Sequence, residues 1–593
     1  MAVDQPTLRD LAVIGDRRTA AIVAADGSIV WYCPGRFDSP SLFASLLDAQ
    51  EGGTWQIELP AGSARGRAYL EDSGVLESRF EIEGHAFTVT DWMPMGAECP
   101  RAICRLFSPT PRAIAMTLKP APDYGRAAVA LSLDGQAVCI QGRHWLYASG
   151  RLQIGDGAIC LELPADEPAW LVLADAPLPT PSHAQLRYWL EQTLAEWRGI
   201  ASEIKYHGPF EKQVAQSIRA LRLMTYAANG GIIAAATASL PEVEGGQRNY
   251  DYRYVWLRDT AMIVGALVRA GSRGVDERRF LAFICGSRSD DAGESLLPPF
   301  VSLDQRRAPD ESQLSLKGYA HSRPVRIGNG ASHQWQLDGF GNVLLAAHLI
   351  YTHHDTREHW ETVRLIADYV AEHWREPDYG IWEESVQRQF TTGKVIASCG
   401  LRYIADCAED GSQAKKWRAA AQEIDDYVAR HCINSEGAYR AFVGSEAVDV
   451  SAALYPAWGY IDAQSAPMVA TLRVLERDYA RDDLYWRHLE EPGPKREGAF
   501  LAATFWVGQY WIMRDDLTRA RRILEAALAY GNDLGLFAEE ADPASGKMLG
   551  NFPQSFVHAA FIGAALDYRN AAGASSRADR SRSPSTTSKG DPQ

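Results

Sequence analysis

The chain has 593 residues, 46% of them hydrophobic and 23% charged, a balance typical of a globular protein with two or three domains. Its formal net charge of -15 argues against a nucleic-acid partner, because phosphate binding needs a basic face. No apolar run approaches the roughly 20 residues needed to cross a bilayer, so we expect no membrane partner.

The nine cysteines are scattered, odd in number and without a CxxC pair. This pattern is typical of free thiols in a reducing compartment rather than of a disulfide framework or a metal site. The first six residues show no basic start leading into an apolar core, so they do not resemble a secretory signal. Together these features predict a cytoplasmic protein.

The first part of the chain has the pattern of short strands. Residues 19–23 and 28–32 are β-rich runs separated by Asp26-Gly27, a tight hairpin turn. Residues 80–89 alternate around Gly84, and similar runs follow at 158–163 and 170–173. Many short strands with Gly and Pro between them predict an antiparallel β-sandwich, which we place at residues 1–185.

Helical spacing begins near residue 185, and we expect a helical linker over residues 186–209. Further helices are expected at residues 210–226, 259–270, 342–352, 357–373, 394–407, 412–431, 466–479, 500–513, 517–529 and 552–566. So many helices without intervening strands indicate a toroid of helical hairpins over residues 210–570, or else a solenoid. The lack of a clear sequence repeat favours the toroid. Residues 571–593, rich in Ser, Arg and Asp, predict a disordered tail.

Two pairs of acidic residues lie in loops beside aromatic residues: Glu383-Glu384, which follows Trp382, and Glu539-Glu540. Two carboxyl groups can hydrolyse a glycosidic bond with inversion when one protonates the leaving oxygen and the other activates a water molecule. Acid pairs are more often solvated surface charge, so this pattern alone does not identify a catalytic site. The 17 Trp and 24 Tyr residues could supply platforms for sugar rings, or simply core packing.

Two further segments mix polar and aromatic residues. Residues 248–259 alternate aromatic and charged side chains, which indicates either a binding site or a structural salt-bridge loop. Residues 323–338 include the amide of Gln336, which could bind sugar hydroxyls, although a loop with a helix cap is the simpler interpretation. The sequence lacks Walker, Rossmann, HExxH and GxSxG patterns and a ligand-like set of histidines, so we expect no cofactor and no metal.

In these segments the chain resembles glycoside hydrolase family 15, the family of glucoamylases and bacterial trehalases. The resemblance runs from about Leu8 to Leu566. It rests on motifs in the right order at residues 14–19, 26–29, 36–40, 122–126, 252–259, 380–383, 497–500 and 549–554. It implies an N-terminal antiparallel β-sandwich followed by an (α/α)6 barrel.

The resemblance also implies the roles of individual residues. Glu383 matches the general acid, Glu539 the general base, and Glu384 a residue on the leaving-group side. The remaining residues expected to bind substrate are Tyr252, Trp256, Arg258 and Asp259 around the non-reducing glucose, with Trp382 and Gln336. The chain departs from the family pattern at Tyr250, Trp335, Gly339, Phe340 and residues 458–467, which concern the leaving group more than the acid and base.

We therefore predict an inverting hydrolase of a small α-glucoside. An α,α-trehalase is favoured because the N-terminal part resembles the trehalase-like domain. The alternative is a glucoamylase-like glucosidase acting on maltooligosaccharides or isomaltose. A carbohydrate-binding protein without catalysis is a third hypothesis, and a sugar phosphorylase a fourth. The presence of both Glu383 and Glu539 argues against the third, and that of Glu539 against the fourth. The sequence does not indicate an oligomeric state.

Overall fold

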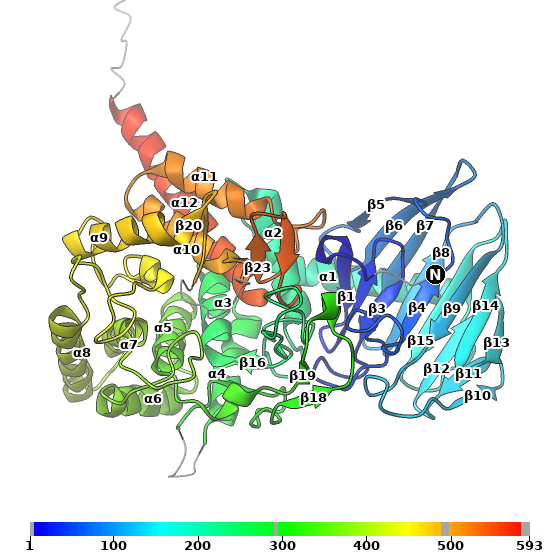
Figure 1. Ribbon diagram of the computed structural model, residues 1–593, viewed down its shortest axis with the longest axis horizontal. Coiled ribbons are helices and arrows are strands. Elements are labelled where there is room, and N and C mark those ends of the chain that lie inside the picture. Colours follow the sequence, from blue (N-terminus) through cyan, green and yellow to red (C-terminus); the bar gives the residue numbers. More distant parts are fainter. Residues whose placement is uncertain (1–4, 290–294, 488–496, 583–593) are drawn as a thin grey trace, which may run out of the picture.

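The computed structural model describes residues 5–289, 295–487 and 497–582, and it places a block of strands before a block of helices (Figure 1). The strands of the first block are β1 (Leu11–Gly15), β2 (Ala20–Ala24), β3 (Ile29–Tyr32), β4 (Thr54–Ile57), β5 (Ala64–Tyr69), β6 (Leu76–Ile82), β7 (His85–Trp92), β8 (Ala102–Phe107), β9 (Ile114–Lys119), β10 (Leu131–Asp134), β11 (Ala137–Ile140), β12 (His144–Ala148), β13 (Arg151–Gly155), β14 (Ala158–Leu163) and β15 (Ala169–Ala174).

These strands form two antiparallel sheets, with the orders β1-β2-β3-β4-β9-β14-β13 and β10-β11-β12-β15-β8-β7-β6-β5. The turn predicted at Asp26-Gly27 joins β2 to β3, and Gly27 adopts a left-handed φ of 84° that suits glycine. Glu83 and Gly84 both have positive φ between β6 and β7, as a tight hairpin of matching twist requires. Both hairpins confirm the strand pattern read from the sequence.

Helix α1 (His183–Ala201) covers the outer face of the second sheet. Every residue of β15 is buried. Alternate side chains face opposite sides of the sheet, and both sides are covered. Leu171 and Leu173 point into the sandwich core, whereas Val172 packs with Leu186 and Trp189 of α1. The segment predicted as a linker is therefore packed against the sandwich over much of its length.

The helical block contains α2 (Glu211–Met224), α3 (Leu257–Arg269), α4 (Val275–Ser287), α5 (Leu337–His354), α6 (Trp360–His373), α7 (Thr391–Ala405), α8 (Gly411–His431), the 3-10 helix η4 (Val450–Leu454), α9 (Ala466–Val474), α10 (Leu501–Met513), α11 (Leu517–Leu528) and α12 (Ser555–Arg582). Outer and inner elements alternate along the chain. The inner ones, α3, α5, α7, η4, α10 and α12, contact one another in a ring.

The ring is closed by the contact of α12 with α3, which makes the helical block an (α/α)6 barrel rather than an open solenoid. The inner helix α10 is buried around nearly its whole circumference, whereas the outer helices α6, α8 and α11 keep an exposed face. One inner position is held by the short η4, where Ser451 Oγ lies 2.7 Å from Thr392 Oγ1 of α7.

The structure differs from the predicted elements in three places. Short paired strands, such as β16 (Val255–Trp256) with β17 (Phe300–Val301), occur within the helical block, which was predicted to have no intervening strands. Helix α4 was not predicted, and two acidic residues of its first turn, Asp276 and Glu277, are buried against Arg222. These two acidic residues give no apolar signal, although Phe280, Leu281 and Ile284 of the same helix are buried at helical spacing. Helix α12 continues to Arg582, so residues 571–582 of the predicted disordered tail are helical, and residues 583–593 lie outside the described part.

Two further properties of the described residues bear on the predictions. All nine cysteines are free, and six of them are buried, although Cys160 is exposed. Among the described helices, none is both long enough and apolar enough to cross a membrane.

Candidate active site

The predicted site residues gather at one end of the barrel, where loops lead from the outer helices into the inner ones. Trp256 is the residue before α3, Gln336 the residue before α5, and Phe500 the residue before α10. The N-terminal ends of inner helices therefore face the site. Their backbone dipoles favour electron-rich groups at this end of the barrel.

A cavity of about 440 Å³ opens among these loops. It is lined by eight of the nine predicted site residues: Tyr252, Trp256, Arg258, Asp259, Trp382, Glu383, Glu384 and Glu539. These residues come from three segments that are far apart in the chain: the loop and first turn of α3, the loop before α7, and the loop before β23. A concave cavity with a few convergent polar groups is the usual form of a small-ligand site.

Glu383 lies in a strained loop before α7. Its φ of 59° is left-handed, which is uncommon for a residue with a side chain and is often found at functional sites. Trp256 Nε1 donates a hydrogen bond of 2.5 Å to Glu383 Oε1. Burial raises the pKa of this carboxyl, while the Arg258 charge and the Trp256 hydrogen bond partly oppose the rise. A raised pKa keeps a proton available for donation.

Glu539 is the residue before the short strand β23 (Glu540–Asp542). Its Oε1 accepts a 2.9 Å hydrogen bond from the Tyr252 hydroxyl, and its Oε2 has no hydrogen-bond partner among the described residues. A Cβ atom at Gly550 would lie 2.8 Å from Oε2, so only glycine fits beside the carboxyl. Burial, followed by repulsion from Glu242, raises the pKa of Glu539 to about 8.

The two carboxyls are linked by two aromatic rings. Tyr252, which contacts Glu539, and Trp256, which contacts Glu383, pack edge to face with centroids 5.4 Å apart. Each carboxyl thus has one fixed oxygen, and both side chains line the same cavity. This arrangement suits two carboxyl groups acting on one bound molecule.

Two of the lining residues, Arg258 and Asp259, form an ion pair at the start of α3. Arg258 Nε donates to Asp259 Oδ1 at 2.8 Å, and Arg258 Nη1 donates to the Ile381 carbonyl at 2.7 Å. Asp259 is only 5% exposed, and burial raises its pKa although Arg258 opposes the rise. The contact to Ile381 also supports the loop that carries Glu383.

Trp382 and Glu384 line the wall beside Glu383. Trp382 Nε1 donates to Asp449 Oδ2 at 2.9 Å, and its ring meets Phe500 edge to face. The Glu384 backbone carbonyl accepts a hydrogen bond from Gln334 Nε2 at 3.3 Å. Burial, then the Asp449 charge, raises the pKa of the Glu384 carboxyl.

Gln336 is the predicted site residue that the cavity lining does not include. It is 3% exposed, and its Nε2 donates at 2.9 Å to Oε1 of Gln334, which does line the cavity. The position before α5 turns Gln336 inward, where its side chain lowers the pKa of Glu383. Gln336 is therefore not part of the cavity lining. Its side chain contacts Gln334 and affects the pKa of the Glu383 carboxyl.

Several lining residues were not predicted from the sequence, notably Glu242, Arg248, Arg487, Gln334 and Gln554. Arg248, Gln334 and Gln554 fall inside segments that the sequence had singled out, so their motifs carried a signal. Glu242 and Arg487 lie in loops without a distinctive pattern. They are brought together by an ion pair of 2.6 Å that joins positions 245 residues apart.

The N-terminal sandwich anchors two of the active-site loops. Arg253, next to Tyr252, is paired with Asp251 at 2.6 Å and donates at 2.9 Å to the carbonyl of Ser39. Its guanidinium lies 5.7 Å from the ring centroid of Trp31 in β3. On the loop that leads to Glu539, Asn532 Nδ2 donates at 2.7 Å to the carbonyl of Leu11 in β1.

The chain matches the family described as Glycosyl hydrolases family 15 over residues 208–516 and 511–566. Residues 2–149 match the domain described as Trehalase-like, N-terminal. A trehalase of Mycobacterium tuberculosis is 30% identical, with 95% of this chain and 89% of that protein covered. A trehalase of Thermoplasma acidophilum is 31% identical, with 91% and 97% covered.

Among solved structures, a bacterial glucoamylase in complex with acarbose has the same fold, with a TM-score of 0.70 over 96% of both chains at 12% identity. The predicted fold, an N-terminal β-sandwich followed by an (α/α)6 barrel, is therefore confirmed. Because the family match spans more than half of the chain and the relatives align along almost all of it, this glycoside hydrolase belongs to glycosyl hydrolase family 15.

Proposed function

We propose that this enzyme hydrolyses α,α-trehalose with inversion, using Glu383 as general acid and Glu539 as general base. The observation that carries the chemistry is that both carboxyls line one cavity while each is bonded to a different member of the Tyr252–Trp256 ring pair. An inverting hydrolase needs two carboxyls that act from opposite sides of one sugar ring.

In this mechanism the Glu383 carboxyl protonates the glycosidic oxygen. Glu539 removes a proton from the water that attacks the anomeric carbon from the other face. Arg258 and Asp259 bind the hydroxyls of the glucose that is attacked, because a buried ion pair with free hydrogen-bonding positions suits a polyol. Glu384, which lines the same cavity, is assigned to the leaving-group side, as the family resemblance implies.

Trehalose is proposed as the substrate because the sequence likeness to trehalases extends over the sandwich as well as the barrel. A cavity of about 440 Å³ also suits a small α-glucoside. A cytoplasmic location, predicted from the N-terminal sequence and the free cysteines, would fit a small soluble substrate.

The substrate is tested by incubating the protein with trehalose, maltose and isomaltose, with and without phosphate, and measuring released glucose. Fastest release from trehalose is expected. Preference for maltose or isomaltose would favour the glucoamylase-like alternative. A strict need for phosphate, with glucose phosphate as product, would indicate a phosphorylase.

The stereochemistry is tested by proton NMR in the first minutes of reaction. Hydrolysis of trehalose with inversion should release one β-glucose and one α-glucose before mutarotation mixes them. Two α anomers would indicate retention, which requires a carboxylate nucleophile about 5–5.5 Å from the acid and would contradict the role of Glu539. Glu539→Ala should abolish turnover, and azide should restore part of it by replacing the attacking water.

A further inference from the structure

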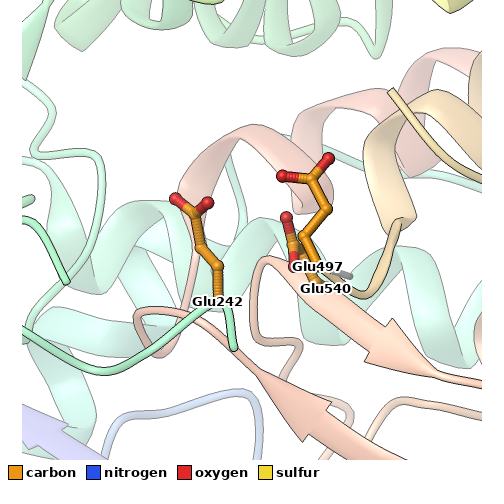
Figure 2. Close-up of side chains that lie close together, drawn as sticks. All are labelled: Glu242, Glu497 and Glu540. Atoms are coloured by element: carbon orange, nitrogen blue, oxygen red, sulfur yellow. The ribbon is translucent and has the colours of Figure 1, made fainter. Parts of the chain in front are cut away.

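Three glutamates that come from separate segments converge beside the proposed base (Figure 2). Glu242 lies in a loop between α2 and β16 (Val255–Trp256), Glu497 precedes β22 (Ala499–Phe500), and Glu540 begins β23. One oxygen from each lies within 4.8 Å of the others, and none of the three residues is more than 3% exposed. We call these three residues the carboxylate triad.

A guanidinium nitrogen lies among the triad. Arg487 Nη2 is 2.6 Å from Glu242, 3.2 Å from Glu497 and 3.4 Å from Glu540. Arg248 approaches from the cavity side, 2.5 Å from Glu242 and 3.4 Å from Glu497. The positive charge that a metal would supply is therefore provided by two arginines.

The same Arg487 also faces Glu539, but more loosely. Its Nη1 is 3.9 Å from Glu539 Oε1, beyond hydrogen-bonding distance. Glu539 lines the cavity, whereas Glu540, the next residue, lies in the triad and accepts a 2.9 Å hydrogen bond from the Gly498 amide. The Arg487 guanidinium therefore lies closer to the triad carboxyls than to Glu539.

Among the described residues, the carboxyls in this region outnumber the cations. Four carboxyls, those of the triad and Glu539, lie around the guanidinium groups of Arg487 and Arg248. Burial would raise the pKa of Glu242, but the Arg487 and Arg248 charges outweigh it and lower the pKa. Burial and the charges of Glu497 and Glu242 raise the pKa of Glu540 well above its usual value.

We propose that Glu242 and Glu497 are positioning residues that keep Glu539 a strong base by holding the Arg487 guanidinium away from it. This inference rests on the proposed role of Glu539 as general base. A carboxylate tightly paired with arginine loses basicity, because the cation stabilises its ionised form. General-base catalysis is most efficient when the pKa of the base lies near the working pH.

The titratable and charged groups that face Glu539 within the described residues are few. Glu242, Arg487 and Glu497 act on its charge, Tyr252 donates a hydrogen bond to it, and Glu540 follows it in the chain. Glu242 is the largest source of repulsion among them. Glu242→Gln should therefore release Arg487 toward Glu539 and stabilise the ionised base.

The test uses α-glucosyl fluoride, whose fluoride leaves without needing a proton from Glu383, so that the acidic limb of kcat/KM reports the base alone. For Glu242→Gln the limb should move to lower pH by about 1 unit. Above the limb kcat should fall a few-fold because the base is weaker, while KM changes little. Glu497→Gln should move the limb in the same direction, and it serves as a second variant if the first does not fold.

The matched control is Glu277→Gln, which also alters a fully buried glutamate paired with a buried arginine, Arg222, at 3.0 Å. It should lower stability without moving the limb. An acidic limb that is unchanged in both triad variants, or that moves to higher pH, would overturn the proposal. Glu539→Gln separates this failure from that of the proposed function: if it hydrolyses the fluoride normally, Glu539 is not the base.

Discussion

The hydroxyl of Tyr252 offers a direct test of how the base is held. Tyr252→Phe removes the donor that lies 2.9 Å from Glu539 Oε1 and leaves the aromatic ring in place against Trp256. The other oxygen of Glu539 has no partner among the described residues, and Arg487 is 3.9 Å away. In this variant the ionised carboxylate therefore loses its one short hydrogen bond.

The magnitude follows from the strength of that bond. A hydrogen bond to a charged group contributes about 1.5–3 kcal/mol. Since one pKa unit corresponds to about 1.4 kcal/mol, the pKa of Glu539 should rise by roughly 1–2 units. The sign is set by the ionised form: the hydroxyl stabilises it and lowers the pKa, so removing the hydroxyl raises the pKa.

A base acts only when ionised, so the acidic limb of kcat/KM should move to higher pH by the same roughly 1–2 units. At a fixed pH below the limb the rate should fall by about 10–100-fold. Initial rates of glucose release from trehalose across the pH range of folded protein measure both quantities. The shift is opposite in direction to the one expected for Glu242→Gln.

Tyr254→Phe is the matched control, because Tyr254 lies in the same loop and its ring stacks with Phe300 rather than contacting Glu539. It should leave the acidic limb where it is. If Tyr252→Phe leaves the limb unchanged, or moves it to lower pH, the hydrogen bond does not stabilise the ionised base and the reasoning fails.

Four other substitutions test the rest of the site. Glu383→Gln cannot donate a proton, so kcat on trehalose should fall by about 10²–10⁴ with KM largely kept, and near-normal turnover would exclude Glu383 as the acid. Arg258→Ala and Asp259→Ala should each lower kcat/KM on every α-glucoside alike, because both residues are assigned to the glucose that is attacked. A loss confined to one substrate would instead assign them to the leaving group, on the other side of the glycosidic bond. Arg253→Met leaves Asp251 as an unpaired buried charge and should cost about 3–5 kcal/mol in chemical denaturation; a cost below about 1 kcal/mol would show that this contact does not anchor the loop on the sandwich.

Much of the fold could be predicted because its signals are local. The strands around Gly27 and Gly84 follow from turn residues and alternation, and the helices follow from apolar spacing of three and four residues. Helix α4 was missed although Phe280, Leu281 and Ile284 are buried at helical spacing, and only the acidic residues of its first turn lack an apolar signal. The end of α12 was missed because its composition resembles a solvated tail.

The site was predicted as a set of motifs, and the amino-acid sequence by itself determined which loops carry carboxyls beside aromatic residues. Only the tertiary structure decided that Glu539 lines the cavity while Glu540 lies in the triad, and that Gln336 contacts Gln334 outside the cavity lining. The pairing of Glu242 with Arg487 is also a property of the tertiary structure alone. The physical reason is that side-chain direction and charge pairing depend on which helix ends the closed barrel brings together, and no spacing along the chain records contacts between segments hundreds of residues apart.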